Sequence, residues 1–98
     1  MSIIVEVPGL LKVYTRAKAE VEGEGTNVGK LLEDLERKYP GLTGQLFNEH
    51  GGLSTLANIF VNEMDFHLLS ELNTPLRKGD RLRLAVAPLI SGGSGYDR

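Results

Sequence analysis

Polar and apolar residues alternate near the C-terminal end of the chain with the period of a strand. Within residues 81–87, Leu82, Leu84 and Val86 take every second position, and arginine or alanine stands between them. A period of two predicts a strand with one buried face. Pro88 follows and cannot donate a hydrogen bond to a neighbouring strand, so we expect ladder pairing to end there. The predicted strand therefore leads directly into the last residues of the chain.

Three segments earlier in the chain also have the character of strands. Residues 3–7 are mostly β-branched and stop at a Pro-Gly pair, and residues 17–22 alternate small or apolar side chains with charged ones. These two segments predict an N-terminal hairpin. Residues 58–62 predict a third strand, in which Phe60 points away from the core because its neighbours point into it. The predicted inward-facing residues are Ile3, Val5, Val7, Ile59 and Val61.

Residues 27–39 change to the period of an amphipathic helix. Apolar side chains recur there at spacings of three and four, which predicts a helix with one buried face. Asn27 is the predicted N-cap, with Thr26 as the alternative, and Pro40 with Gly41 predicts the end of the helix. The apolar positions are Val28, Leu31, Leu32, Leu35 and Tyr39.

The polar face of this helix carries two oppositely charged pairs at a spacing of four residues. Glu33 precedes Arg37, and Asp34 precedes Lys38. In this orientation each pair stabilises a helix by about 0.2–0.5 kcal/mol. Such pairs are typical of a solvated helix face, so they predict no functional site.

The order of these elements predicts the fold. The hairpin and helix are followed by a helical turn anchored by Leu46 and Phe47, the third strand, an irregular stretch at residues 68–76 and the final strand. This order favours an α+β roll with one main helix packed across one face of a mixed sheet. The final strand has the cleanest alternation, so we expect it in the centre, parallel to the first strand through right-handed crossovers. This arrangement is the ubiquitin-like β-grasp.

Size and composition are those of one small globular domain. The chain has 98 residues, of which 41% are hydrophobic and 24% charged, and its formal net charge is −2. A negative net charge does not indicate binding of nucleic acid. The apolar runs are far shorter than the ~20 residues that span a bilayer. The first residues do not form a signal peptide, so we expect a cytoplasmic protein. The absence of cysteine excludes disulfides, thiolate metal sites and a thiol nucleophile in this chain.

The spacing of the remaining polar residues indicates neither catalysis nor a metal site. His50 and His67 are far apart and have no ligand set around them, so they read as surface or loop residues. Gly51 and Gly52 predict a turn. No acid/base pair follows from the spacing of the acidic residues. The predicted turn and surface carboxylates are Glu49, Glu63, Asp65 and Asp80.

Several fragments, taken in order, resemble the MoaD/ThiS family of ubiquitin-like sulfur-carrier proteins, and within it the CysO-like carriers. The likeness covers residues 3–93 and ends at a diglycine. No single fragment is specific, but their order and the terminal diglycine together make a strong signature. The fragments are NVGKLL at 27–32, KYPGL at 38–42, IFVN at 59–62, NTPL at 73–76, KGD at 78–80 and PLISGG at 88–93.

The resemblance implies a carrier whose reactive group is the carboxylate of Gly93. A ubiquitin-activating-type adenylyltransferase would use ATP to adenylate this group, which would then become a thiocarboxylate. The sulfur would pass to a cysteine-synthase-like enzyme or to the large subunit of a molybdopterin synthase. The carrier itself would bind no cofactor or metal and would supply no catalytic residue. The tail that these enzymes would recognise is Leu89, Ile90, Ser91 and Gly92.

One departure from the simplest family pattern lies after the diglycine. Residues 94–98 follow, so the encoded chain holds Gly93 in amide linkage to Ser94. Related carriers with such extensions are trimmed by a JAMM-type zinc metalloprotease, which implies cleavage between Gly93 and Ser94. We therefore expect a carrier domain at residues 1–93 and a flexible extension at residues 94–98 that is removed. The alternative is a retained extension with loss or change of the carrier function.

The face of the predicted sheet away from the helix is a candidate partner surface. Phe60, Arg81 and Arg83 share it with two alanines, and aromatic residues and arginine are enriched at interface cores. Truncation of Phe60 to alanine is expected to weaken partner binding and to leave thermal stability nearly unchanged.

Two other classes of function stay open at this point. An adenylated diglycine would also serve a ubiquitin-like protein modifier that is joined through Gly93 to lysines. A β-grasp interaction module that is never activated is the third class. The sequence does not select the pathway that would receive the sulfur.

Overall fold

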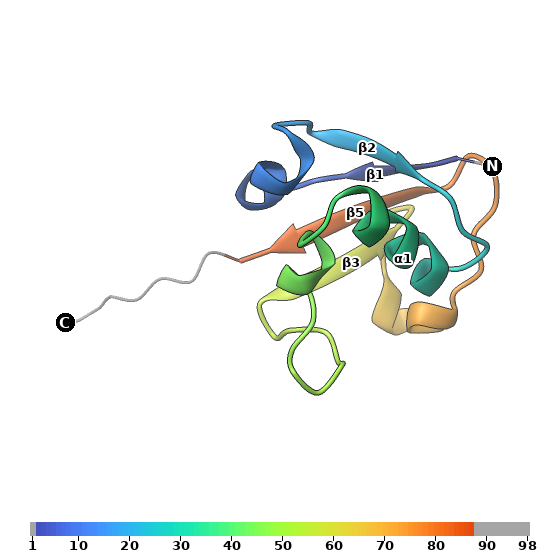
Figure 1. Cartoon of the computed structure of the whole chain (residues 1–98). Coiled ribbons are helices and arrows are strands. Elements are labelled where there is room, and N and C mark those ends of the chain that lie inside the picture. Colours follow the sequence, from blue (N-terminus) through green and yellow to red (C-terminus); the bar gives the residue numbers. More distant parts are fainter. Residues whose placement is uncertain (1, 88–98) are drawn as a thin grey trace.

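The computed structural model describes residues 2–87, and its centre is a mixed sheet with one α-helix across one face (Figure 1). The strands are β1 (Ile3–Glu6), β2 (Glu20–Gly23), β3 (Ala57–Val61), β4 (Met64–Asp65) and β5 (Arg81–Val86), and the helix is α1 (Val28–Lys38). Short 3-10 helices in the connections are η1 (Gly9–Thr15), η2 (Thr43–Gln45), η3 (Phe66–Leu68) and η4 (Glu71–Asn73). The predicted α+β sheet with one main helix across it is confirmed.

β5 is the central strand, as predicted. The strand order is β2-β1-β5-β3-β4. β5 runs parallel to β1, with Val5 opposite Leu82, and antiparallel to β3, with Ile59 opposite Leu84. β1 and β2 form the predicted antiparallel hairpin, in which Val5 lies opposite Val21. Because β1 and β5 are parallel, both strands end at the same edge of the sheet.

α1 begins and ends where local chemistry favours it. The Oδ1 atom of Asn27, the predicted N-cap, accepts a hydrogen bond from the backbone N–H of Lys30 at 2.8 Å. At the other end, the N–H of Tyr39 donates to the carbonyl of Leu35 at 2.7 Å. Gly41 follows with a φ of +96°, a left-handed conformation that favours glycine. The helix therefore matches the predicted segment closely.

The hydrophobic core lies between α1 and the sheet. The predicted inward-facing side chains of β1 and β3 are all buried. The predicted anchors after α1 are confirmed too, because Leu46 is fully buried and Phe47 packs against the core. A Cβ atom at Gly25 would overlap the backbone of Leu31, so glycine allows the chain after β2 to pass close to α1. Fully buried apolar side chains include Ile3, Val5, Val28, Leu31, Leu35, Leu42, Ile59 and Leu82.

The second strand is shorter than predicted because its first predicted residues form a turn. Arg16 and Ala17 have φ values of 56° and 67°, and β2 begins only after this turn. The hydroxyl group of the buried Thr15 lies 3.3 Å from the carbonyl oxygen of Lys12 and 2.9 Å from that of Lys18. A buried hydroxyl group requires such partners, and the chain bends around it. The alternation seen at the start of residues 17–22 is therefore not that of a strand.

The prediction of a wholly solvated charged face on α1 is wrong for Asp34. Its carboxylate is buried, accepts a hydrogen bond from the backbone N–H of Glu24 at 2.9 Å, and pairs with Lys38 at 3.1 Å. Arg37 also pairs with Asp34, whereas it was predicted to pair with Glu33. The Glu24 hydrogen bond is the main cause that lowers the pKa of Asp34. Asp34 therefore joins α1 to the segment that follows β2.

Glu36 stabilises the turn that follows α1. Its Oε2 atom accepts a hydrogen bond from the N–H of Gly41 at 2.7 Å. Its Oε1 atom accepts from the N–H and the hydroxyl group of Thr43 at 3.1 and 2.7 Å. These bonds, with that of Gly41 foremost, lower the pKa of Glu36. The carboxylate thereby sets the direction of the chain into η2.

Candidate functional site

The face of the sheet opposite α1, called the open face below, holds the predicted partner residues. The register of β3 and β5 sets Phe60 opposite Arg83 and Asn58 opposite Ala85, so these side chains are neighbours on one face. Arg81 lies two residues before Arg83 on β5 and shares this face. The structure therefore brings Phe60, Arg81 and Arg83 together, while their role in binding a partner stays a prediction.

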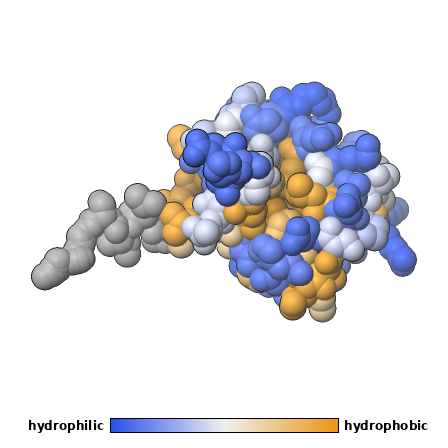
Figure 2. Space-filling model, turned by 90° about the horizontal axis from the view of Figure 1, so that it is seen from below, coloured by the Kyte–Doolittle hydropathy of each residue, from blue (hydrophilic) through white to orange (hydrophobic). Residues whose placement is uncertain are grey.

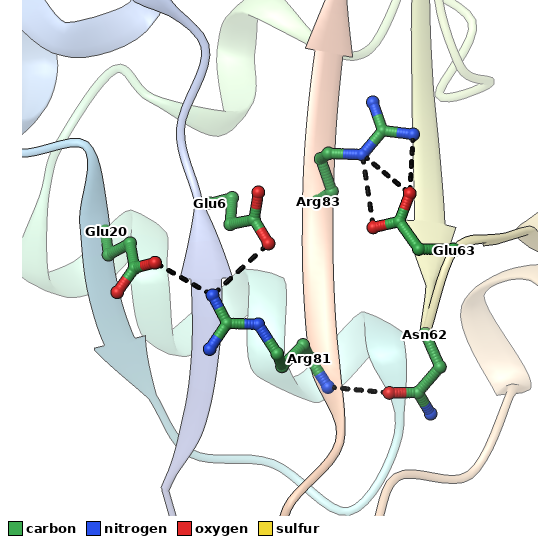
Figure 3. A network of polar contacts seen from close by, with 6 residues as sticks. All are labelled: Glu6, Glu20, Asn62, Glu63, Arg81 and Arg83. Carbon is green, nitrogen blue, oxygen red and sulfur yellow. Dashed lines mark hydrogen bonds and ion pairs between the residues drawn. The ribbon is translucent and has the colours of Figure 1, made fainter.

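Arg83 lies over the ring of Phe60 and is held there by Glu63. The guanidinium carbon of Arg83 is 4.2 Å from the ring centroid, within the range of a cation–π contact. Its Nε and Nη2 atoms donate to Oε1 of Glu63 at 3.2 and 3.1 Å (Figure 3). The ring of Phe60 is consequently covered on one side by a guanidinium group that already has a carboxylate partner.

Arg81 joins three strands through two carboxylates. Its Nη2 atom donates to Glu20 on β2 at 2.8 Å and to Glu6 on β1 at 3.2 Å (Figure 3). These carboxylates, with that of Glu20 foremost, raise the pKa of Arg81. Glu6 and Glu20 were not identified from the sequence. Glu6 lies opposite Arg83 in the parallel β1–β5 pair and so shares a face of the sheet with both arginines. The register of this pair is therefore the signal from which Glu6 could have been predicted.

The turn between β3 and β4 places Glu63 beside Arg83. Asn62 and Glu63 have φ values of 52° and 68°, so the chain reverses within these two residues. The Asn62 side chain accepts a hydrogen bond from the N–H of Arg81 at 3.0 Å and donates to Asp80 at 3.1 Å. The sequence predicted a turn through Asp65, whereas Met64 and Asp65 form the short strand β4. The turn chemistry of Asn62 thus fixes the position of Glu63.

The end of β5 is the point from which the predicted reactive tail starts. The N–H of Ala87 donates to the carbonyl of Leu56 at 2.7 Å. A groove of about 300 Å³ lies beside the ends of β1 and β5, and Glu6, Pro8 and Ala85 are among its lining residues. The predicted tail residues and cleavage junction, Leu89, Ile90, Ser91, Gly92, Gly93 and Ser94, lie outside the described residues.

The histidine and acidic residues of the described chain form no metal site. His67 contacts Asp65 at 2.8 Å, and Asp65 also accepts a hydrogen bond from the side chain of Asn58 at 2.9 Å. The Asn58 bond is the main cause that lowers the pKa of Asp65. Within residues 2–87, no three histidine or acidic side chains are grouped so as to hold a metal ion. Nor does any helix in this range have the length and apolarity needed to cross a membrane.

Comparison with known proteins identifies the family. A model of the ThiS family matches residues 5–93. The chain belongs to the ThiS family. Among its relatives, the sulfur carrier protein CysO of Mycobacterium tuberculosis is 30% identical over 95 residues, which are 95% of this chain and 100% of that protein. Small archaeal modifier protein 3 of Haloferax volcanii is 34% identical over 88 residues, which are 90% of this chain and 87% of that protein.

Solved structures of ThiS-family relatives confirm the fold. The crystal structure of the Amycolatopsis orientalis BexX/CysO complex matches this ThiS-family chain with a TM-score of 0.81 at 27% identity, over 93% of this chain and 99% of that one. The predicted ubiquitin-like β-grasp and the resemblance to CysO-like carriers are therefore confirmed. The relatives are sulfur carriers and modifiers and not enzymes.

Proposed function

We propose that this ThiS-family chain is a sulfur carrier that uses the C-terminal carboxylate of Gly93. The observation that carries the proposal is the match to CysO, a sulfur carrier protein, over the whole length of that protein. The fold supports it, because the chain leaves the sheet at the C-terminal end of the central strand β5, and the sequence then continues to Gly92 and Gly93. The proposed location of the reactions is the cytoplasm, where ATP is available.

Release of the Gly93 carboxylate is the first proposed step. A JAMM-type zinc metalloprotease adds water across the amide between Gly93 and Ser94, which yields a carboxylate on Gly93 and a free amine on Ser94. The protease supplies the metal and the acid/base groups. This chain supplies an amide flanked by residues that are free of large side chains at Gly92, Gly93 and Gly95.

Activation of the carboxylate follows in a partner enzyme. A ubiquitin-activating-type adenylyltransferase joins a carboxylate oxygen to the α-phosphorus of ATP, and pyrophosphate leaves. A sulfide donor then attacks the carbonyl carbon; the new C–S bond replaces the C–O bond to AMP, and Gly93 becomes a thiocarboxylate. A glycine is suited to this substitution because no Cβ atom hinders the approach of the sulfur. The ATP belongs to the partner, and the chain itself binds no cofactor.

The chain contributes a rigid body for docking and a tail of defined reach. Gly93 is the sixth residue after Ala87, and an extended chain spans at most about 3.3–3.6 Å per residue. Gly93 can therefore lie up to about 20 Å from Ala87, the residue after β5. The open face with Phe60, Arg81 and Arg83 is the proposed docking surface for the adenylyltransferase, and β5 runs across this face from Arg81 toward the tail. A sulfur-accepting synthase, cysteine-synthase-like or the large subunit of a molybdopterin synthase, is the proposed final partner.

An activation assay with defined C-termini tests the proposal. Three forms of the chain are compared with the adenylyltransferase of the same organism: the full chain, a form that ends at Gly93, and a form that ends at Gly92. We expect ATP–pyrophosphate exchange with the form ending at Gly93 alone. Equal exchange with all three forms, or exchange with none, would contradict the assignment of Gly93.

A protein modifier is the second candidate, and one observation favours it. Small archaeal modifier protein 3 is more similar in percentage identity than CysO, although over less of its own length. In that case the adenylated Gly93 is transferred to lysine amines of other proteins. Mass spectrometry of trypsin-digested cellular protein separates the two functions. Because trypsin cleaves after Arg83, modification leaves residues 84–93 joined through Gly93 to the lysine, and sulfur transfer leaves no such remnant.

A further inference from the structure

We propose that the partner that docks on the open face presents basic side chains around an apolar centre. This inference rests on the proposed function, because the partner is taken to be the adenylyltransferase. It concerns the chemistry of the partner surface. Both arginines of the open face already have carboxylate partners within the chain.

The open face is more acidic than the rest of the molecule. Five carboxylates and two guanidinium groups lie on the outward positions of the strands and on the β3–β4 turn, which leaves a formal charge of −3. The whole chain carries only −2, so the remainder of the molecule is slightly positive. The charged residues of this face are Glu6, Glu20, Glu22, Glu63, Asp65, Arg81 and Arg83.

The two arginines are poor targets for carboxylates on a partner. An acidic partner side chain would have to displace Glu63 from Arg83, or Glu20 from Arg81, where the distances are 3.1 and 2.8 Å. The displaced carboxylate would then remain close by and repel the newcomer. A lysine or arginine on the partner faces no such competition, since it adds a cation to carboxylates that outnumber the local guanidinium groups.

Glu22 is the carboxylate that is best placed to receive a basic side chain. It is exposed on the edge strand β2, beside the alternating buried positions Val21 and Gly23. Its side chain forms no ion pair with any other described residue, and only its backbone carbonyl is engaged, by Lys38 at 3.3 Å. Glu22 therefore adds negative charge to the open face without a compensating cation.

An apolar centre lies between the two acidic borders. Phe60 is partly buried, and one side of its ring is covered by Arg83, so an incoming apolar group meets the rest of the ring and Ala85. On the β2 side of this centre, Glu6 lies on β1, and Glu20 and Glu22 lie one strand farther away on β2; Glu63 lies on the β4 side. The partner surface that fits is an apolar side chain flanked on two sides by lysine or arginine.

The opposite layer of the molecule has a different character. α1 carries three basic and three acidic residues and therefore has no formal net charge; they are Lys30, Arg37, Lys38, Glu33, Asp34 and Glu36. Figure 2 shows apolar area between hydrophilic patches on the side of the molecule seen from below. Because the negative charge is concentrated on the open face, an electropositive partner would orient the molecule with this face toward itself. Electrostatic steering of this kind changes the association rate most at low ionic strength.

Charge reversal on each face tests the inference with matched variants. Glu22→Lys changes the open face, and Glu33→Lys makes the same change of net charge on the exposed side of α1. Association of each form, ending at Gly93, with the immobilised adenylyltransferase of the same organism is measured at low and at physiological ionic strength. We expect E22K to slow association several-fold at low ionic strength and E33K to stay within about twofold of the unmodified chain, with the difference shrinking as salt screens it. Glu22→Gln, which keeps the shape of the side chain, should give an intermediate rate.

The outcomes separate this inference from the proposed function. ATP–pyrophosphate exchange is measured on the same preparations, and circular dichroism verifies that the variants are folded. The unmodified chain can support exchange while E22K associates as fast as the unmodified chain or faster. This result would overturn the basic partner surface and leave the carrier function intact. An association rate that does not change with salt would do the same. No exchange by the unmodified chain would overturn both.

Discussion

Phe60→Ala separates a surface role of the ring from a core role. A fully buried phenylalanine contributes about 1.5–3 kcal/mol, so the partly buried ring of Phe60 accounts for roughly 1–1.5 kcal/mol. The cation–π contact with Arg83, at 4.2 Å, adds about 0.5–1 kcal/mol. We therefore expect the free energy of unfolding to fall by about 2 kcal/mol, and not to stay nearly unchanged as the sequence alone suggested. A core phenylalanine would cost about 3–5 kcal/mol.

Urea unfolding measures this loss, and a double-mutant cycle resolves its parts. The cycle of Phe60→Ala with Arg83→Ala should give a coupling energy of about 0.5–1 kcal/mol. Ile59→Ala, at the adjacent buried position, is the core control and should cost about 2–5 kcal/mol. A loss for Phe60→Ala of more than about 3 kcal/mol, with no coupling to Arg83, would refute the placement of the ring on the open face.

Binding of the adenylyltransferase is the functional half of the same prediction. Loss of a central aromatic anchor typically costs a complex 2 kcal/mol or more, so Phe60→Ala should raise the dissociation constant by about tenfold or more. The matched control is Asp34→Ala, which destabilises the fold from the opposite layer and should leave the dissociation constant unchanged. Equal weakening by both variants would show that the effect comes from lost stability and not from the open face.

Two further predictions concern the carboxylates on the helix side. Asp34→Ala should lower the free energy of unfolding by about 1–3 kcal/mol in urea, because it leaves the Glu24 N–H without its acceptor, whereas the exposed neighbour Glu33→Ala should change it by less than about 0.5 kcal/mol. The folded pKa values of Asp34 and Glu36 are both lowered, so their stabilising contribution is complete above the unfolded pKa values near pH 4 and is lost as the pH falls through the lower folded values. The urea midpoint should therefore drop as the pH falls below about 5, and a smaller drop in Asp34→Ala than in the unmodified chain would verify the assignment, while equal drops would contradict it.

Regular periods explain why much of the fold was predictable from the sequence. Residues of α1 and β5 that share one face recur at fixed spacings, and burial on that face is the reason for the recurrence. The central position of β5 followed from its alternation, and the opposite directions of Phe60 and Ile59 followed from the pleat of β3.

Contacts between distant segments explain what the sequence did not predict. The start of β2 depends on the buried hydroxyl group of Thr15, and its partners are carbonyl groups that carry no signal in the sequence. The burial of Asp34 depends on the passage of Glu24 beside α1. The ion pairs of Arg81 with Glu6 and Glu20 depend on how β1 and β2 are aligned with β5. Local patterns do not encode such pairings, so the arginines were taken as available to a partner.

The central claim is that Gly93 carries sulfur, and the intact mass of the protein from growing cells tests it most directly. The account predicts a species that ends at Gly93 and is heavier than the carboxylate by the difference between one sulfur and one oxygen atom. This species should revert to the carboxylate mass when an alkylating agent and base remove the sulfur. A protein that keeps residues 94–98 in cells that are active in sulfur transfer, with no sulfur-bearing species at Gly93, would contradict the account.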